Sequence, residues 1–368
     1  MIKEGHFGFM EAFSVMAIVL VTKIFYGSPM ALIKYLGTAA WYGTLISLVG
    51  ALVFFTLLYL LMKRFPQEDL FQIFETVTGK IIGKALILTF GVFLIYKAGI
   101  NLREFTAVLK VYSMPFTPPS MIMLPFLIVV AVMAYVGLEG IVRVAHIFFY
   151  LVFGALVLII LLAIPSYDFN YLQPILGYGL GKTVQTGLIR VAAYDEIVLL
   201  AIIIRSLQGL QVFKKIGYLT LILGGLTFSV CLICILAAFQ YTVGGEHLSG
   251  MYQLSRAIYF TRFFQRIESI FLFVWVISSV ITVSFIFYIS LNAYSRVFNI
   301  SNHRPLILPF IFLTFMAAFI PNNFAEIMEI HLRVLREFSS VIFIFIPVMV
   351  LGLALLRGKK GVETSGKA

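Results

Sequence analysis

The sequence predicts an all-α integral membrane protein with ten transmembrane helices, of which the first and sixth are broken. Three observations lead to this fold class. Of the 368 residues, 61% are hydrophobic and only 12% are charged, which is far from the composition of soluble domains. About ten apolar stretches are long enough to cross a bilayer. The first, third and sixth of them carry charged residues in their interior, and the first also carries helix-breaking residues.

The predicted spans account for most of the chain, so residues 1–368 are expected to form a single transmembrane domain without a soluble one. The spans cover residues 7–36, 38–62, 82–112, 120–138, 142–164, 183–206, 216–242, 267–297, 305–320 and 338–356. An even number of spans places both termini on the same side of the membrane. Most loop Lys and Arg residues fall on that side, so we expect it to be cytoplasmic.

Composition also excludes several functions. The formal net charge of +11 comes from basic residues dispersed over short loops, and it offers no basic domain for nucleic acid. Cys231 and Cys234 share an apolar run with no nearby histidine, so we expect no metal and no cofactor. We find no phosphate-binding glycine loop and no nucleophile paired with a base, so the chain is not expected to be an enzyme.

Three polar segments separate the spans. In residues 65–79, apolar residues recur at helical spacing, which predicts an amphipathic helix on the inner membrane surface. Residues 246–266 are expected to form its outer counterpart. Residues 322–337 are too charged to span, and we expect them to lie along the outer surface.

The first span contains a helix-breaking stretch. Gly27 supplies backbone freedom and Pro29 lacks a donor, so the helix should unwind around Tyr26, Gly27 and Ser28 and restart with Pro29 in its first turn. The freed amides and the positive end of the second half-helix would attract an anion. A simple proline kink explains the same residues without any site.

The sixth span carries the adjacent carboxylates Asp195 and Glu196. An Asp at the centre of a span costs about 3 kcal/mol, so such residues mark a pathway or a partner. Interrupted helices in the first and sixth positions are what a five-plus-five inverted repeat produces, with halves at residues 7–164 and 183–356. In such folds the two broken helices meet at the midplane and frame a substrate.

Lys23 lies beside the first interruption, and pairing with Asp195 or Glu196 would keep its ammonium charged in the membrane. Two interpretations are open. The pair either closes the site or titrates during a conformational step, or it is a static ion pair that fixes the register of the helices.

The third span has a polar face, because Lys97, Asn101 and Glu104 recur at intervals of four and three residues. These side chains could belong to the site as ligand-binding and charge-coupling groups. Pairing of the charges within their own helix is the alternative that requires no function.

The eighth span is rich in hydroxyl groups. Ser278, Ser279 and Thr282 lie where they could coordinate a cation beside the unwound first helix. Serine and threonine also commonly hold membrane helices together. The sequence leaves both interpretations open.

Five stretches together resemble the permease-like B subunits of bacterial spore germinant receptors, within the amino acid, polyamine and organocation transporter superfamily. They are KRFP at 63–66, NLREF at 101–105, MPFTPP at 114–119, GLEGIVRVAHIF at 137–148 and RIESIFLFVW at 266–275. The resemblance implies a LeuT-like inverted-repeat fold and a place in the spore inner membrane. It also implies partner A and lipoprotein C subunits and recognition of a small germinant, such as an amino acid.

Carried over to this sequence, the family's helix breaks fall on residues 26–29 and 193–196. The chain departs from the glycine-rich first-helix pattern at Ile24, Phe25 and Tyr26, which implies a smaller pocket or a different ligand. Lys23 beside the break could also stand in for a coupling cation.

These observations give one expected mechanism. Backbone amides at Gly27 and Ser28 would hold a ligand carboxylate, and Asp195 or Glu196 would meet its ammonium group. The ligand-binding residues expected are Tyr26, Gly27, Ser28, Asn101, Tyr194, Asp195 and Glu196, and the charge-coupling residues are Lys23, Lys97, Glu104 and Glu196. A proton-coupled amino acid transporter, in which Lys23 or Glu196 titrates, is the alternative function. A scaffold or ion-conducting subunit without a working pocket is a third.

Overall fold

The computed structural model describes residues 7–244, 247–258 and 267–361, and all regular structure in these ranges is helical. The first half contains α1 (Phe9–Val21), η1 (Thr22–Phe25), α2 (Ser28–Leu36), η2 (Gly37–Ala39), α3 (Ala40–Arg64), α4 (Leu70–Thr78), α5 (Lys80–Tyr112), α6 (Pro119–Val136), α7 (Leu138–Leu162), η3 (Ile164–Ser166) and η4 (Phe169–Leu172).

The second half continues with α8 (Leu180–Ile189), η5 (Arg190–Val198), α9 (Leu199–Ile202), η6 (Ile204–Ser206), α10 (Leu210–Ala238), α11 (Tyr241–Gly244), α12 (Gly250–Ala257), α13 (Ile267–Val297), η7 (Arg304–Leu306), α14 (Ile307–Ala318), α15 (Phe324–Glu326), η8 (Ile327–His331), η9 (Val334–Phe338), η10 (Val341–Phe345) and α16 (Ile346–Leu356). The elements η1 to η7 are 3-10 helices, whereas η8, η9 and η10 are π-helical.

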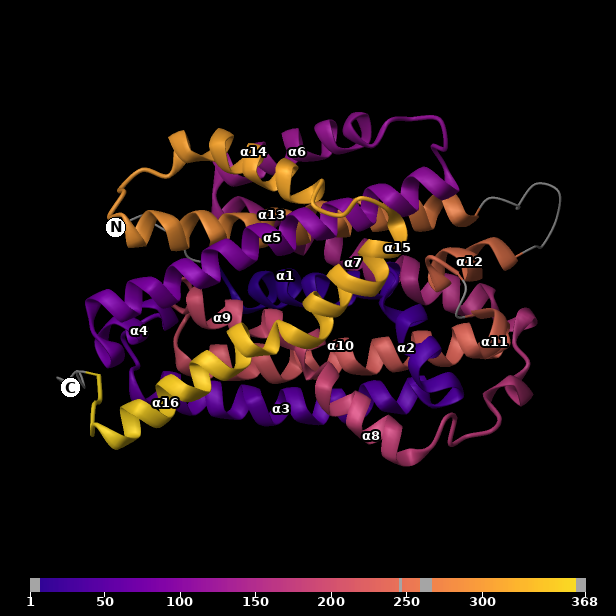
Figure 1. The fold of residues 1–368 in the computed structure, drawn as a ribbon, viewed down its shortest axis with the longest axis horizontal. Helices are drawn as coiled ribbons and strands as arrows, with labels where there is room; N and C mark the ends of the chain where they lie inside the picture. Colours follow the sequence, from indigo (N-terminus) through magenta and orange to yellow (C-terminus); the bar gives the residue numbers. More distant parts are fainter. Residues whose placement is uncertain (1–6, 245–246, 259–266, 362–368) are drawn as a thin grey trace.

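The long helices run along one axis of the molecule (Figure 1). Helices α3, α5, α10 and α13 follow this axis, and the yellow helix from α15 to α16 crosses the front diagonally. The first and last described residues lie at the same end, on the left of the figure. There the amide of Gly361 donates to the carbonyl of Arg64 over 3.0 Å. We call this end the terminal end and the opposite one the far end.

Seven described helices are long and apolar enough to cross a membrane. They are Ser28–Arg64, Lys80–Tyr112, Pro119–Val136, Leu138–Leu162, Leu210–Ala238, Ile267–Val297 and Phe324–Leu356, and Arg304–Ala318 is a shorter apolar helix. The predicted span at 183–206 is absent from this set, and only residues 28–36 of the predicted span at 7–36 enter it, joined to the next span, because both predicted spans are divided into short helices. The count of ten and the halves 7–164 and 183–356 stay predictions.

The two divided spans depart from α-helix at the predicted positions. Helix α1 ends at Val21, η1 tightens the chain, and Tyr26 is extended before α2 begins at Ser28 with Pro29 in its first turn. In the second case α8 ends at Ile189, and the nine residues of η5 form a 3-10 helix. The predicted second break is therefore a tightened helix and not an extended segment.

Two surface predictions were wrong. The amphipathic helix predicted within residues 65–79 exists as α4, but its apolar residues Leu70, Ile73, Phe74 and Val77 are fully buried against protein and not spread on lipid. Residues 324–337 do not lie along the surface. They continue into the last span as one helix whose inner face is buried. Of residues 246–266, only part is described, as α12; residues 246 and 259–266 lie outside the described ranges.

Apolar side chains on the outside and tight contacts inside are both typical of a membrane bundle. Ile128, Ile147 and Leu308 are each more than three-fifths exposed, as expected for lipid-facing residues. Inside, a Cβ added at Gly99 would lie 2.6 Å from the Cβ of Ala317, so α5 and α14 touch through a glycine.

Candidate functional site

Four buried charges lie where the two divided spans meet. Lys97 Nζ, on α5, lies 2.6 Å from Asp195 Oδ1 and 2.8 Å from Glu196 Oε1. Lys23, on η1, forms an ion pair with Glu196 and donates a hydrogen bond to the carbonyl of Ala193. All four side chains are at most 6% exposed. We call Lys23, Lys97, Asp195 and Glu196 the charge cluster.

The charge cluster is neutral, with two ammonium groups facing two carboxylates. Each ion alone would carry a large desolvation cost in a bundle core, and mutual pairing offsets most of it. Since Lys23 comes from η1, Lys97 from α5 and both carboxylates from η5, the cluster joins three segments that are distant in sequence. Of the two partners predicted for Lys23, Asp195 and Glu196, the ion pair forms with Glu196, and Lys97 pairs with η5 and not within its own helix.

At the first interruption, protein groups contact Gly27 and Ser28. The amide of Gly27 donates to Glu104 Oε1 over 2.9 Å, and the hydroxyl of Ser28 accepts from Arg336 Nε over 2.8 Å. The thioether of Met328 lies against Gly27, since a Cβ there would be 2.6 Å from its methyl carbon. The position predicted for a ligand carboxylate at the Gly27 amide is thus held by the side-chain carboxylate of Glu104.

The two tyrosines of the predicted site contact neighbouring helices. The Tyr26 hydroxyl donates to Ser279 Oγ over 2.9 Å, and its ring stands edge-on to Trp275. The Tyr194 hydroxyl lies 3.0 Å from Thr44 Oγ1 on α3. Both rings are almost fully buried, and Tyr194 lines a small cavity together with Ser28 and Arg190.

The hydroxyls predicted for a cation site are engaged with protein. Thr282 Oγ1 donates to Thr22 Oγ1 over 3.0 Å, and Ser278 Oγ donates to the carbonyl of Trp275 within α13. Thr282 and Ser279 join α13 to the first divided span, as hydroxyls do between membrane helices. Coordination of a cation by these groups stays a prediction.

Asn101 is the least connected of the predicted residues. It is 4% exposed, and its Oδ1 makes no hydrogen bond within the described ranges. It lies on the same face of α5 as Lys97 and Glu104, which bind the two interruptions. A buried unpaired oxygen at this position costs about 1–3 kcal/mol, and a ligand-binding role for Asn101 stays a prediction.

Two buried arginines were missed by the sequence reasoning. Arg336, on η9, is 2% exposed, and its Nη2 lies 3.9 Å from Glu104 Oε2. Arg190, the first residue of η5, is 4% exposed, and its Nη2 lies 3.9 Å from Glu337 Oε1. The helical spacing of Leu332, Leu335 and Arg336 was a signal for a buried face. The burial of Arg336 was not predicted because residues 322–337 were expected to form a surface segment.

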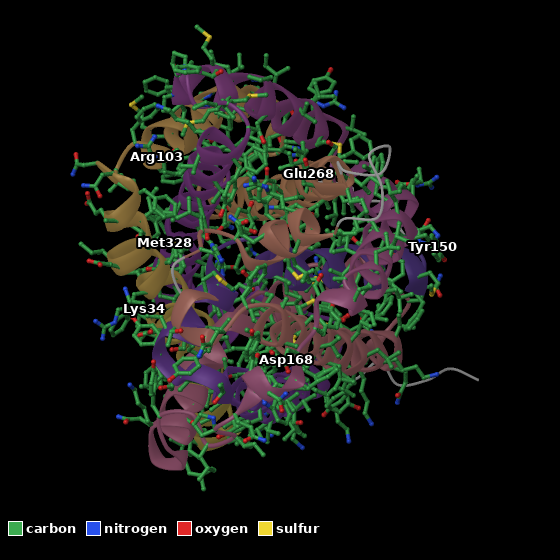
Figure 2. All side chains as sticks on the ribbon, turned by 90° about the vertical axis from the view of Figure 1, so that its right-hand side faces the viewer. Lys34, Arg103, Tyr150, Asp168, Glu268 and Met328 are labelled. Carbon is green, nitrogen blue, oxygen red and sulfur yellow. The ribbon has the colours of Figure 1, made fainter. Side chains whose placement is uncertain are left out.

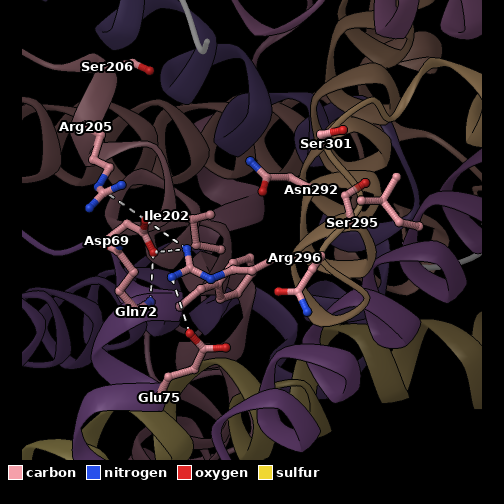
Figure 3. Close-up of a pocket in the computed structure, with 13 residues that line it drawn as sticks. Asp69, Gln72, Glu75, Ile202, Arg205, Ser206, Asn292, Ser295, Arg296 and Ser301 are labelled. Atoms are coloured by element: carbon pink, nitrogen blue, oxygen red, sulfur yellow. Dashed lines mark hydrogen bonds and ion pairs between the residues drawn. The ribbon is translucent and has the colours of Figure 1, made fainter. Parts of the chain in front are cut away.

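A cavity lies at the terminal end, apart from the charge cluster (Figure 3). Its volume is about 470 Å³, and it is lined by the start of α4, by α9 and η6, and by the end of α13. Asp69 accepts from Arg296 Nη1 at 2.8 Å and faces Arg205 Nε at 3.5 Å. These ion pairs tie the three elements together around the cavity.

Near the interruptions the cavities are small. One is lined by Ser28, Tyr35, Arg190, Met328 and Arg336, among others, and a second by Ser28, Arg190 and Tyr194 with their neighbours. Each has a volume of about 10 Å³, which is room for about one water molecule. A larger ligand therefore requires the surrounding elements to move.

Viewed from the far end, Met328 and Lys34 lie along one edge of the molecule, and Tyr150 lies at the opposite edge (Figure 2). The last span and α2 therefore share the edge next to the first interruption, where these small cavities lie.

Solved structures show the same fold. The structure of Mhp1, a nucleobase-cation-symport-1 family transporter in a closed conformation with bromovinylhydantoin bound, is 12% identical, with a TM-score of 0.67 over 88% of this chain and 74% of that one. A Na⁺-coupled sialic acid symporter in a substrate-bound outward-open state is 14% identical, with a TM-score of 0.64 over 96% and 79% of the two chains. The predicted LeuT-like transporter fold is thereby confirmed.

Sequence relatives come from Bacillus subtilis (strain 168). Spore germination protein KB is 21% identical over 339 residues, which is 90% of each chain. The protein YfkT is 22% identical over 250 residues, or 68% of each chain. The family model described as spore germination protein matches residues 7–327. The chain therefore belongs to the spore germination protein family, as the resemblance in its sequence implied.

Proposed function

We propose that the chain is the permease-like subunit of a spore germinant receptor that binds a small polar germinant, an amino acid, at mid-membrane. The family match and the transporter fold support a germinant receptor or permease-like membrane protein. The single observation that carries the proposal further is the charge cluster between η1 and η5, because its charges are complementary to those of a zwitterion.

In this proposal the ligand's ammonium group meets Asp195 or Glu196. Lys23 occupies that position when no ligand is bound, since it forms the ion pair with Glu196. Exchange of one ammonium for another leaves the buried charge balanced, so it avoids the cost of an uncompensated ion. Tyr26 and Tyr194 form walls for the ligand's side chain, and Asn101 offers it an unpaired oxygen.

Release of Lys23 would loosen the contact between η1 and η5. Occupancy would then favour one arrangement of the divided spans over another, by the difference in ligand affinity between the two. We propose that this shift is passed to A and C subunits in the spore inner membrane, with both termini of this chain in the cytoplasm. The partners and the location follow from the family resemblance.

A proton-coupled amino acid transporter is the second candidate, favoured by the solved neighbours, which are both transporters. In that function the same residues would cycle with every substrate molecule, and Lys23 or Glu196 would exchange the proton.

Binding and flux separate these functions. Purified protein is screened for thermal stabilisation by each common L-amino acid, and liposomes holding this chain alone are tested for uptake of the stabilising amino acid under a pH gradient. Stabilisation without uptake supports the receptor subunit, and accumulation above the external concentration supports the transporter. If no amino acid stabilises the protein, the proposed ligand class is wrong.

A further inference from the structure

Arg336 and Arg190 are buried cations that the charge cluster does not use. The Nε of Arg336 donates to Ser28, but its Nη1 and Nη2 make no hydrogen bond within the described ranges. The Nε of Arg190 is also without a partner there, and its guanidinium lies 5.4 Å from the centre of the Tyr35 ring. Each unsatisfied buried donor of this kind costs about 1–3 kcal/mol.

The neighbouring carboxylates do not satisfy these donors. Glu104 approaches Arg336 only to 3.9 Å because its other oxygen is bound to the amide of Gly27. Glu337 approaches Arg190 only to 3.9 Å, and its other oxygen accepts from Arg333 Nε at 3.0 Å. Both pairs are beyond hydrogen-bonding distance, so the two guanidinium groups keep donors for a further acceptor.

These donors face one place in the molecule. Arg336 and Arg190 both line the small cavity beside Ser28, and Arg190 and Ser28 also line the second cavity, which reaches Tyr194. A group bound between the guanidiniums would therefore lie next to the first interruption, with the wall formed by Tyr194 beyond it. Arg336 stands in a π-helical stretch, a local irregularity that is frequent at functional sites.

We propose that Arg336 and Arg190 form the carboxylate subsite of the ligand, on the far-end side of the charge cluster. A planar guanidinium binds a carboxylate through two parallel hydrogen bonds, a geometry that an ammonium cannot offer. This inference rests on the proposed ligand site and names its chemistry: the ligand is a small carboxylate, and its anionic group is held by these side chains and not by the amide of Gly27.

The subsite also connects ligand binding to the last span. Arg336 comes from η9 and Arg190 from η5, and Ser28, which accepts a hydrogen bond from Arg336, begins α2. A carboxylate that bridges the guanidiniums would hold these three elements together. Because Glu104 is the competing resident anion beside Arg336, its neutralisation should strengthen binding of an external carboxylate.

The test uses purified full-length protein and sodium acetate, with sodium chloride at the same ionic strength as the reference and ethylammonium chloride as the ammonium-only probe. Affinities are taken from the shift of the thermal unfolding midpoint with concentration. We expect acetate to bind in this subsite and to stabilise the wild-type protein, whereas ethylammonium should not bind there. Arg336→Gln should weaken acetate binding about 10- to 100-fold, as for loss of charge-assisted hydrogen bonds.

Three further variants make the test specific. Arg190→Gln should weaken acetate binding as well, and Arg336→Lys should restore only part of it. Glu104→Gln, whose amide oxygen can still accept from Gly27, should strengthen acetate binding several-fold. Arg143→Gln is the control, because Arg143 is 62% exposed and pairs with Glu139 on the surface; it should bind acetate as the wild type does. If Arg336→Gln does not fold, acetate binding by Arg190→Gln and Glu104→Gln tests the carboxylate subsite instead.

The outcomes distinguish the two proposals. Equal stabilisation of the wild type and Arg336→Gln by acetate, or no stabilisation of either, overturns the carboxylate subsite. If an amino acid stabilises both proteins equally, the proposed function stands and the subsite fails. If acetate stabilises only the wild type and no amino acid stabilises it, the subsite stands and the amino acid as germinant fails.

Discussion

Removing Lys97 should destabilise the protein strongly, because it is the central cation of the charge cluster. Its ammonium lies 2.6 Å from Asp195 and 2.8 Å from Glu196, and all three side chains are at most 1% exposed. Lys97→Met keeps the length of the side chain and leaves two buried carboxylates facing only Lys23. Breaking a buried pair in this way costs about 3–5 kcal/mol.

A second variant tests whether charge balance is the cause. Lys97→Met combined with Asp195→Asn restores one cation to one anion and keeps the pair between Lys23 and Glu196. The double variant should therefore be more stable than the sum of the single effects predicts, by about 2–3 kcal/mol. Lys182→Met is the control. Lys182 is exposed on α8 and lies over the Tyr178 ring, so its loss should cost about 0.5 kcal/mol or less.

The assay is reversible unfolding in mixed micelles titrated with a denaturing detergent, followed by tryptophan fluorescence and circular dichroism. The reasoning is refuted if Lys97→Met costs no more than Lys182→Met. It is also refuted if the double variant loses as much stability as the two single changes added together, since the cost would then be unrelated to charge balance.

Three other changes test the fold and its terminal end. Gly99→Ala should lower the free energy of unfolding by about 1–3 kcal/mol, because it forces α5 away from Ala317. The control Gly154→Ala, with open space around it, should be neutral or stabilising in thermal unfolding. Equal effects of the two changes would contradict the close contact between α5 and α14. Asp69→Asn keeps the cap of α4 but breaks the ion pairs to Arg296 and Arg205. A reporter cysteine introduced by Ser295→Cys in the cavity should then react with a thiol reagent about 2- to 10-fold faster than the same reporter with Asp69 present. An unchanged rate would show that these pairs do not close the cavity. Burial and the nearby Arg304 lower the pKa of His303 below its ordinary value, so protonation favours the unfolded chain. The stability of the wild-type protein should therefore fall as pH drops through about 6.5. His303→Gln should lose less stability than the wild type between about pH 7 and pH 5, and identical pH profiles of the two proteins would exclude this contribution.

The sequence was sufficient for the parts of the fold that depend on hydrophobic length and on single helix-breaking residues. Gly27 and Pro29 act locally, so a restart of the helix with Pro29 in its first turn could be predicted, although Ser28, expected in the unwound stretch, is already the first residue of α2. The pairing of Lys23 with Asp195 or Glu196 could also be predicted, because a charge inside an apolar span must find a partner of opposite sign.

Features set by tertiary packing could not be predicted in the same way. The charge of residues 322–337 indicated a surface segment, whereas the fold buries Arg336 beside Ser28 and Glu104. The carboxylate bound to the Gly27 amide comes from Glu104, 77 residues away in sequence, and helical spacing alone did not say what the polar face of α5 would contact. The second interruption became a 3-10 helix, which composition does not distinguish from an extended break.

The central claim is that the divided spans meet around the charge cluster and that a ligand binds there. Equilibrium binding of a radiolabelled amino acid, chosen as one that stabilises the wild-type protein, tests it most directly in Glu196→Gln and in Glu139→Gln, whose carboxylate is exposed. We expect Glu196→Gln to bind at least about tenfold more weakly and Glu139→Gln to bind as the wild type does. Undiminished binding by Glu196→Gln would contradict the account.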